Sequence, residues 1–274
     1  MKSITVSSIF ATLIVMSSAA ASQSAKVPQA AWRPTPFTGA IPAGYSGENA
    51  DQFLRVLLAA PKVKKDEFET TADFEARSAK AIPQISPIDP GAAYAFRLPV
   101  SATYDADSQS YKIDTQYGCG PSGYAFMGDS PILCTILERV ERQGSYNASN
   151  AFGANANVTK VLNTKISITL PKAVLSRRDL FRKVGIGLDN SYTLDHRIYI
   201  PINKAAAFRG KNIQAIFVGS IVSANVVIGR GMHAGPSVGS PYEITGREIG
   251  LPFAPSKVLF YVVETGEILE AIDL

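Results

Sequence analysis

A serine and a histidine in the last quarter of the chain have residue types and a spacing that could carry out nucleophilic catalysis. Gly235-Pro236-Ser237-Val238-Gly239 matches the G-x-S-x-G turn of serine hydrolases, and His233 precedes the serine by four residues. In those enzymes the turn follows a strand and opens a helix. Here a glycine-rich loop comes first, and Ser240-Pro241 follows, which resists helix formation. We therefore expect Ser237 and His233 to lie in a loop, and a secreted hydrolase that uses them is the alternative function.

Other candidates for acid, base or metal chemistry are few. His196 falls among apolar residues, where a hydrogen-bonded core side chain is a commoner role than a general base. Asp105 and Asp107 resemble part of a calcium loop that lacks its glycine and its distal glutamate. The histidine and cysteine count predicts no metal site, and no glycine motif indicates a nucleotide cofactor. A carboxylate pair that meets only in space stays open as a hydrolase site.

The two cysteines, Cys119 and Cys134, are 15 positions apart. In an oxidising compartment an isolated pair most simply forms one structural disulfide, worth about 3 kcal/mol on the loop-entropy estimate. A redox role is the less favoured reading because the spacing is not C-x-x-C. The loop between the cysteines contains Tyr124 and Phe126, which can form a contact surface.

The first 21 residues indicate export. Lys2 is followed by an apolar run from Ile9 to Met16 and then by small residues ending at Ala21, which is the order of a cleavable signal peptide. The run is shorter than the about 20 residues that span a bilayer. We expect cleavage after about Ala21, a periplasmic or secreted location, and no transmembrane segment in the mature chain.

A short segment has the pattern of a capped helix. Thr70 can accept the backbone N–H of Asp73, whose carboxylate reaches back toward Thr70. Asp73 lies four residues before Arg77 on the same face, which favours an ion pair. Phe68 can pack against Phe74 and hold the entering chain. The pattern predicts a helix that begins after Thr70.

The same segment, EFETTADFEAR at residues 67–77, resembles a helix that precedes a β-rich body in secreted or envelope proteins of Gram-negative bacteria whose function is not known. Weaker echoes lie at residues 200–208, 216–219 and 264–267. The resemblance implies an exported, β-rich protein and assigns no catalytic residue.

Aromatic and basic side chains outside the predicted core are candidates for an interaction surface. Trp32 and Phe37 lie in a proline-rich stretch and either dock a partner or pack on the domain's own surface, which is the commoner outcome. Residues 176–183 predict a short basic helix that either meets an anionic polymer or stays solvated. The candidates are Trp32, Phe37, Tyr124, Phe126, Arg177, Arg178, Arg182 and Lys183.

Strand patterns dominate after residue 92. Residues 158–170 alternate between apolar and polar side chains, as in a strand with one buried and one solvated face. Residues 213–228 are apolar at both parities, as in a central strand pair. Residues 94–115 and 257–274 each predict a hairpin, and 192–200 predict a strand with His196 on its apolar face. Before them, Ser46 can cap a helix that runs to residue 59.

These patterns predict an α+β fold, mainly antiparallel, sandwich-like or with two packed sheets, and two N-terminal helices. The expected organisation is a signal peptide (1–21), a proline-rich extended arm (22–45), a helical segment (46–82) and a β-rich domain (92–274), which can hold two sub-sheets.

The composition is that of a globular protein, with 46% hydrophobic residues and a net charge of +4. This charge is too mild to indicate a nucleic-acid partner. Together with export and the absence of a catalytic motif, it favours a non-enzymatic binding or interaction module of the cell envelope. The expected partner is an envelope protein or an anionic envelope polymer. An exposed, unpaired sheet edge would instead favour a structural assembly factor.

Overall fold

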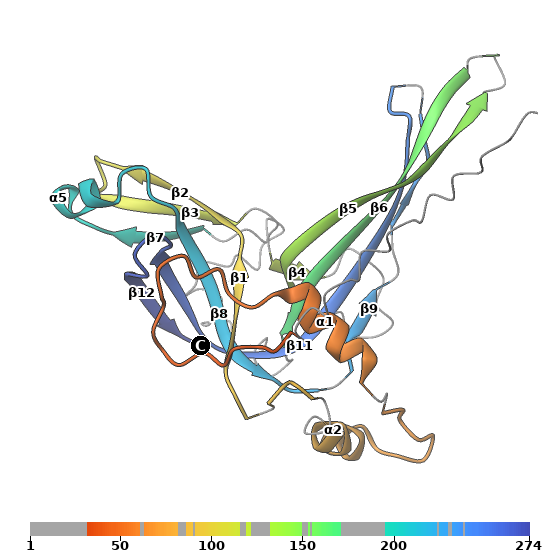
Figure 1. The fold of residues 1–274 in the computed structure, drawn as a ribbon, viewed down its shortest axis with the longest axis horizontal. Helices are drawn as coiled ribbons and strands as arrows, with labels where there is room; N and C mark the ends of the chain where they lie inside the picture. Colours follow the sequence, from red (N-terminus) through yellow and green to blue (C-terminus); the bar gives the residue numbers. More distant parts are fainter. Residues whose placement is uncertain are drawn as a thin grey trace, which may run out of the picture. The chain divides into compact units, whose positions relative to one another are not determined.

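The computed structural model describes residues 32–60, 63–81, 86–89, 91–115, 119–121, 132–149, 153, 155–170, 195–223, 225–229, 232–237 and 239–274. Its contacts divide the chain into two units, Met1–Trp32 and Arg33–Leu274, and every element below belongs to the second (Figure 1). Within the described residues, no helix has the length and apolar character that a membrane span needs.

Two β-sheets and a few short helices make up this unit. The larger sheet contains β1 (Tyr94–Leu98), β4 (Cys119–Pro121), β5 (Ile132–Ser149), β6 (Asn155–Leu170), β8 (Ile213–Ile221), β9 (Val227–Gly229), β10 (His233–Ala234), β11 (Tyr242–Val262) and β12 (Ile268–Asp273). The smaller sheet contains β2 (Val100–Asp105), β3 (Ser110–Thr115) and β7 (Asp195–Tyr199). The helices are α1 (Ala50–Ala59), α2 (Thr71–Ala81), α5 (Ile202–Ala205) and the 3-10 turn η2 (Ala206–Phe208).

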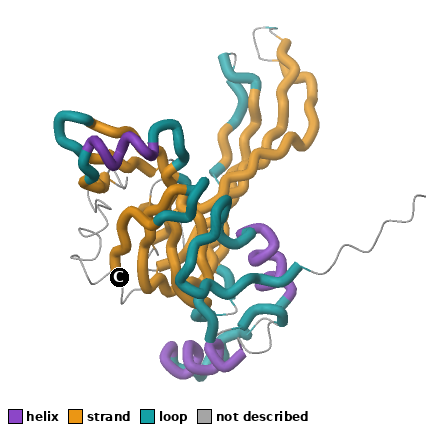
Figure 2. Tube along the Cα trace, turned by 60° about the vertical axis from the view of Figure 1, so that its left-hand side comes forward, coloured by secondary structure: helices purple, strands orange, loops and turns teal. Residues whose placement is uncertain are grey.

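The strand order of the larger sheet is β1-β8-β11-β6-β5-β4, with β9, β10 and β12 also paired to β11. The smaller sheet is ordered β2-β3-β7. Among the described strand pairs only β6 and β11 run parallel. The expected α+β fold with mainly antiparallel strands is therefore confirmed, and Figure 2 shows the helices at the margins of the strands.

Strand β11 passes through both halves of the larger sheet. Its first half pairs with β6, and its second half, from Phe253, pairs with β8 and β12. The register with β8 shifts between Pro255 and Lys257, where the strand bends. Gly219 pairs with Pro255, and a Cβ on it would lie 2.1 Å from the carbonyl oxygen of Ala254. Only glycine allows so close an approach of the two backbones.

The predicted strand pair at residues 213–228 forms two strands, but they do not pair with each other. β8 and β9 both run antiparallel to β11, β8 along its second half and β9 along its first. Apolar residues at both parities indicate that both faces are buried, and they carry no information about which strand is the neighbour. That part of the prediction is therefore wrong.

Side chains cap the starts of both N-terminal helices. The side-chain oxygen of Asn49 accepts the N–H of Gln52 at 3.0 Å, so Asn49 caps α1 and the predicted cap at Ser46 is wrong. The Thr70 hydroxyl accepts the N–H of Asp73 at 3.2 Å and donates to its carboxylate at 2.6 Å. The predicted cap of α2 is confirmed.

The ion pair of α2 differs from the predicted one. Arg77 donates to both carboxylate oxygens of Glu69, at 2.8 and 2.6 Å, and makes no bond to Asp73. Hydrogen bonding from Arg77 lowers the pKa of Glu69 to about 2. Phe68 is 89% exposed, so it does not pack on Phe74 as expected. A charged contact that closes the loop before the helix replaces the predicted apolar one.

Aromatic rings fill the core under α1. Phe53 is fully buried, and its ring centroid lies 5.0 Å from that of Tyr94 and 5.1 Å from that of Phe96, both edge-on. Phe96 meets Phe253 of β11 in the same way at 5.3 Å. Such edge-to-face pairs add stability beyond the burial of their area. The helix thus joins β1 and β11 in one core.

Residues 33–48 lie against the larger sheet. The N–H of Phe37 donates to the carbonyl of Ala93 at 2.7 Å, and the hydroxyl of Tyr261 donates to the carbonyl of Tyr45 at 2.7 Å. Phe37 is partly buried against a core cluster from β1, β8 and β11. The second of the two expected roles for Phe37, packing on its own domain, is the one observed.

The far parts of β5, β6 and β11 continue past this core (Figure 1). We call residues 139–149, 155–163 and 242–247 the sheet extension. None of residues 139–149 is buried, and in the other two ranges only Val158 and Gly246 are. The Tyr146 hydroxyl donates to Glu243 at 2.8 Å, and the Lys160 ammonium lies 5.1 Å from the Tyr146 ring centroid. Cross-strand pairs, and not a core, hold this region together.

Candidate ligand-binding site

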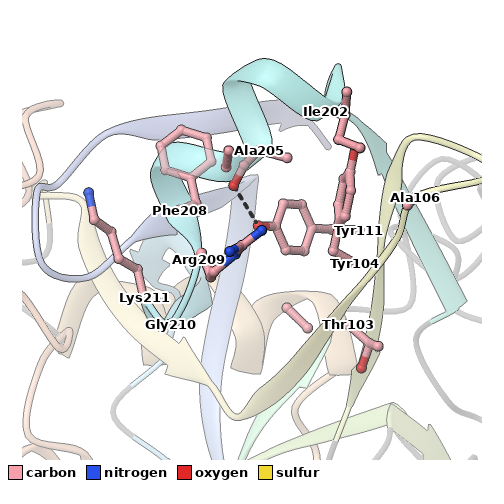
Figure 3. Close-up of a pocket in the computed structure, with 12 residues that line it drawn as sticks. Thr103, Tyr104, Ala106, Tyr111, Ile202, Ala205, Phe208, Arg209, Gly210 and Lys211 are labelled. Atoms are coloured by element: carbon pink, nitrogen blue, oxygen red, sulfur yellow. Dashed lines mark hydrogen bonds between the residues drawn. The ribbon is translucent and has the colours of Figure 1, made fainter.

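A cavity of about 540 Å³ opens between the β2–β3 hairpin and the α5–η2 turn (Figure 3). This size is typical of pockets for small molecules. Aromatic rings form one part of its wall, and two cations lie on the segment that follows η2. The lining residues are Ala102, Thr103, Tyr104, Ala106, Tyr111, Ile202, Ala205, Ala206, Phe208, Arg209, Gly210 and Lys211.

Two tyrosines form the aromatic part of the wall. Tyr104 and Tyr111 are directly opposite each other in the β2–β3 pair, with ring centroids 4.9 Å apart. The Tyr104 hydroxyl donates to the carbonyl of Ile200 at 2.9 Å, which fixes the ring. The Tyr111 hydroxyl points to the carbonyl of Ala205 at 3.5 Å, a long contact. Burial raises the pKa of Tyr111, and neighbouring Tyr104 raises it further, so the Tyr111 ring acts as a neutral wall.

Buried anchors place the two cations at the pocket. Ala205 and Phe208 are each 4% exposed and tie the α5–η2 turn to the body. The chain then leaves the core, so Arg209 is exposed and Lys211 half-buried. The Lys211 ammonium lies 5.8 Å from the Phe208 ring centroid, and Figure 3 shows Arg209 pointing toward Tyr111 in that view.

Arg209 and Lys211 are the charged residues that line the pocket. Within the described part of the chain, neither forms an ion pair with a carboxylate. An arginine offers a planar fork of donors that suits a carboxylate or a phosphate, and tyrosine faces suit the apolar face of a ring. The pocket is therefore suited to a ring that carries negative charge.

Ser237 and His233, the pair of the alternative hydrolase function, lie on different elements. His233 lies on β10 and pairs with Thr245, while Ser237 forms an isolated bridge with Ser240. No hydrogen bond joins their side chains among the described residues, and the strand β11, not a helix, follows at Tyr242. Ser237 lies outside the named strands as expected, whereas the expectation that His233 lies in a loop is wrong because it pairs with β11.

His196 has the structural role that the sequence favoured. Its Nε2 lies 2.9 Å from a carboxylate oxygen of Glu270 on β12, and its ring stacks on Phe260 with centroids 4.9 Å apart. Its side chain is 12% exposed. His196 thereby connects the smaller sheet to the larger one.

A buried polar cluster escaped the sequence analysis. The Ser167 hydroxyl donates to Glu248 at 2.9 Å and lies 3.2 Å from the Thr135 hydroxyl. Ser167 is fully buried and Glu248 is 5% exposed. The alternation in residues 158–170 placed Ser167 on the solvated face, which is wrong because this part of β6 is covered on both faces. A substrate in solvent cannot reach this serine.

The aspartates of the β2–β3 turn stabilise the turn itself. The Asp105 carboxylate accepts the N–H of Asp107 at 3.0 Å and the hydroxyl of Ser108 at 2.7 Å. The bonds from Ser108 lower the pKa of Asp105. Among the described residues, no group of three or more His, Cys, Asp or Glu side chains is arranged to hold a metal ion.

Several predicted residues lie outside the described part of the chain. They are the signal peptide and the candidates Tyr124, Phe126, Arg177, Arg178, Arg182 and Lys183. Trp32 belongs to the other unit, so its role stays a prediction. Cys119 and Cys134 are described, and they are directly opposed in the β4–β5 pair.

Comparisons with known proteins found no matching family, no similar curated protein and no similar solved structure.

Proposed function

We propose that this chain is an exported binding module of the cell envelope that takes a negatively charged ring, such as an acidic sugar of an envelope polymer, in the pocket between the β2–β3 hairpin and η2. The observation that carries the proposal is the meeting of the Tyr104–Tyr111 wall with two cations that have no carboxylate partner in the described chain. The half-buried Tyr104 supplies contact area beside the buried Tyr111, and the cations supply the preference for an anion.

The proposal for this pocket is binding. Its described lining contains no His, Cys, Asp or Glu, and its ionisable groups are Tyr104, Tyr111, Arg209 and Lys211. Thr103 supplies the one aliphatic hydroxyl of the lining, without a base beside it. The Ser167–Glu248 contact is buried and therefore closed to a substrate from solvent.

Calorimetry with two matched trisaccharides tests the proposal. Trigalacturonic acid is expected to bind, and its affinity should fall as salt rises because ions screen the exposed cations. Neutral trigalactose should bind at least about tenfold more weakly, the equivalent of one charged hydrogen bond. Arg209→Ala and Lys211→Ala should each lower the affinity for the acid by about tenfold.

The control is Lys257→Ala, which removes the same charge at the β11–β12 pair, where Lys257 contacts Asp273, and should leave binding unchanged. Equal affinity for the acidic and neutral sugars, binding of neither, or an affinity unaffected by both pocket substitutions would each overturn the proposal.

Export is part of the proposal. We expect the mature chain to begin near Ser22 and to carry a Cys119–Cys134 disulfide in a periplasmic or secreted location. Directly opposed residues of an antiparallel pair have Cα atoms about 4.5 or 5.5 Å apart, within the about 4.4–6.8 Å that a disulfide spans, and the register of β4 and β5 supports this bridge. Mass spectrometry of the protein from its host should give a mature N-terminus near residue 22 and a mass 2 Da below that of the dithiol, about the mass of two hydrogens; an uncut chain with two thiols contradicts it.

A further inference from the structure

One edge of the sheet extension has no partner strand in the described chain. β6 pairs along one side of β5, and on the other side β4 covers only Ile132 to Cys134. Among the residues that the structure describes, no strand pairs with the rest of that side. An open row of backbone donors and acceptors is a ready template for another strand.

Two bulges bound a regular stretch of this edge. The register of β5 against β6 shifts between Thr135 and Leu137 and again between Arg142 and Gly144. Gly144 has φ +116°, which a residue with a side chain rarely adopts. Bulges and charged side chains normally keep a sheet edge from pairing. Residues 137–142, between the bulges, pair with β6 in unbroken register.

The charges of this stretch are arranged so that a second, antiparallel copy can place an opposite charge beside each of them. Its central residues read Glu138-Arg139-Val140-Glu141-Arg142. If a second copy runs antiparallel with Val140 opposite Val140, Glu138 faces Arg142 and Arg139 faces Glu141. Centring the pair on Arg139 or on Glu141 would instead place that residue opposite its own copy, and like charges directly opposite destabilise a sheet. Of these three registers, only the one centred on Val140 matches every charge with its opposite.

We propose that β5 pairs with β5 of a second copy of this chain, antiparallel and centred on Val140, to form a closed two-fold dimer. Each edge is used once, so the pairing ends at two copies and does not continue into a fibre. The inference does not depend on the ligand pocket, which lies on β2, β3 and η2.

Contacts inside one copy prepare the stretch for this pairing. Arg139 is held by Asp51 of α1 at 3.0 Å and by Glu141 at 2.7 Å, so little side-chain freedom is lost on association. Val140 is 63% exposed, and the pairing would cover it with its own copy at the centre of the contact. The five paired residues stay clear of β4, and the last of them, Arg142, borders the second bulge.

Charge reversal tests the register. The purified protein should sediment as a dimer. Arg142→Glu places Glu opposite Glu138, and Glu138→Arg places Arg opposite Arg142, so each should weaken the dimer at least about tenfold. The double variant Glu138→Arg/Arg142→Glu restores opposite charges and should restore the dimer. Arg209→Glu, the same charge change outside β5, should leave it intact.

A cross-link supplies a measurement that does not depend on the charges. Paired Cα atoms at the centre lie about 4.5 or 5.5 Å apart, within disulfide range. Val140→Cys should give a covalent dimer on mild oxidation, whereas Ser149→Cys, outside the paired stretch, should not. A monomeric wild-type protein, a double variant as weak as the single ones, or equal cross-linking at both positions overturns the proposal.

Discussion

The two halves of β11 belong to regions with opposite sources of stability. The second half, from Phe253 to Val262, lies in a core with α1, β1 and β8, and most of its residues are buried. The first half starts in the sheet extension, where Tyr242 and Arg247 are exposed and Tyr146 reaches across to Glu243. Hydrophobic burial dominates folding energetics, while exposed side-chain pairs contribute little each.

This contrast indicates which region of the molecule has surface available for association with another chain. The core region has satisfied its apolar groups within the chain. The sheet extension keeps a backbone edge and Val140 open in the described structure. The sheet extension gains little stability from contacts within its own chain, so association with another chain can stabilise it most. This agrees with the proposed pairing of β5 between two copies.

The largest expected effect is in the core. Phe53→Ala removes a fully buried ring that meets Tyr94 and Phe96, and the free energy of unfolding should fall by about 3–5 kcal/mol. Urea denaturation measures it. The control Phe68→Ala removes a ring that is 89% exposed and should change stability by less than about 0.5 kcal/mol. Similar losses for both would contradict a stabilising role for the burial of Phe53.

A smaller effect is expected where the two halves of β11 meet. Gly219→Ala would place a Cβ 2.1 Å from the carbonyl oxygen of Ala254, so the backbones must move apart, at a cost of about 1–3 kcal/mol. The control is Gly235→Ala, where no heavy atom lies within 4 Å of the added Cβ. Thermal unfolding should show a lower midpoint for the first variant alone.

Within the sheet extension, single changes should have small effects. Tyr146→Phe removes the hydroxyl that bonds Glu243 and should lower stability only slightly because the pair is exposed. The control Tyr242→Phe removes an exposed hydroxyl that has no side-chain hydrogen bond within the described chain. Amide hydrogen exchange should speed up near residue 146 in the first variant only. A global loss as large as that of Phe53→Ala would contradict the comparison.

The smallest effect concerns pH and the loop before α2. Because Arg77 lowers the pKa of Glu69 from 4.5 to about 2, their contact contributes its full stability above pH 4.5 and loses it as the pH falls toward 2. NMR titration should show the Glu69 carboxyl ionising near pH 2, and Arg77→Ala should return its pKa toward 4.5. Arg55→Ala, on α1, should leave that pKa unchanged.

Elements with local signals were predictable. The cap at Thr70 and the β11–β12 hairpin depend on residues close in sequence, and both are present. The hairpin predicted at residues 94–115 is present as β2 and β3, whereas Tyr94–Leu98 pairs with β8. The cap of α1 at Asn49 was missed because Ser46 also satisfies the same local pattern. The sequence did not decide whether Phe37 docks a partner or packs on its own domain. Its packing involves Ala93, which is distant in sequence.

The sequence alone determined the fold class, the two N-terminal helices and the nearness of Cys119 to Cys134 in the chain. Only the tertiary structure decided that β8 and β9 both pair with β11, that Ser167 and Glu248 are buried together, and that Arg209 and Lys211 meet the Tyr104–Tyr111 wall. The physical reason is that periodicity reports which faces of a strand are buried, whereas the identity of its neighbours depends on contacts between residues far apart along the chain.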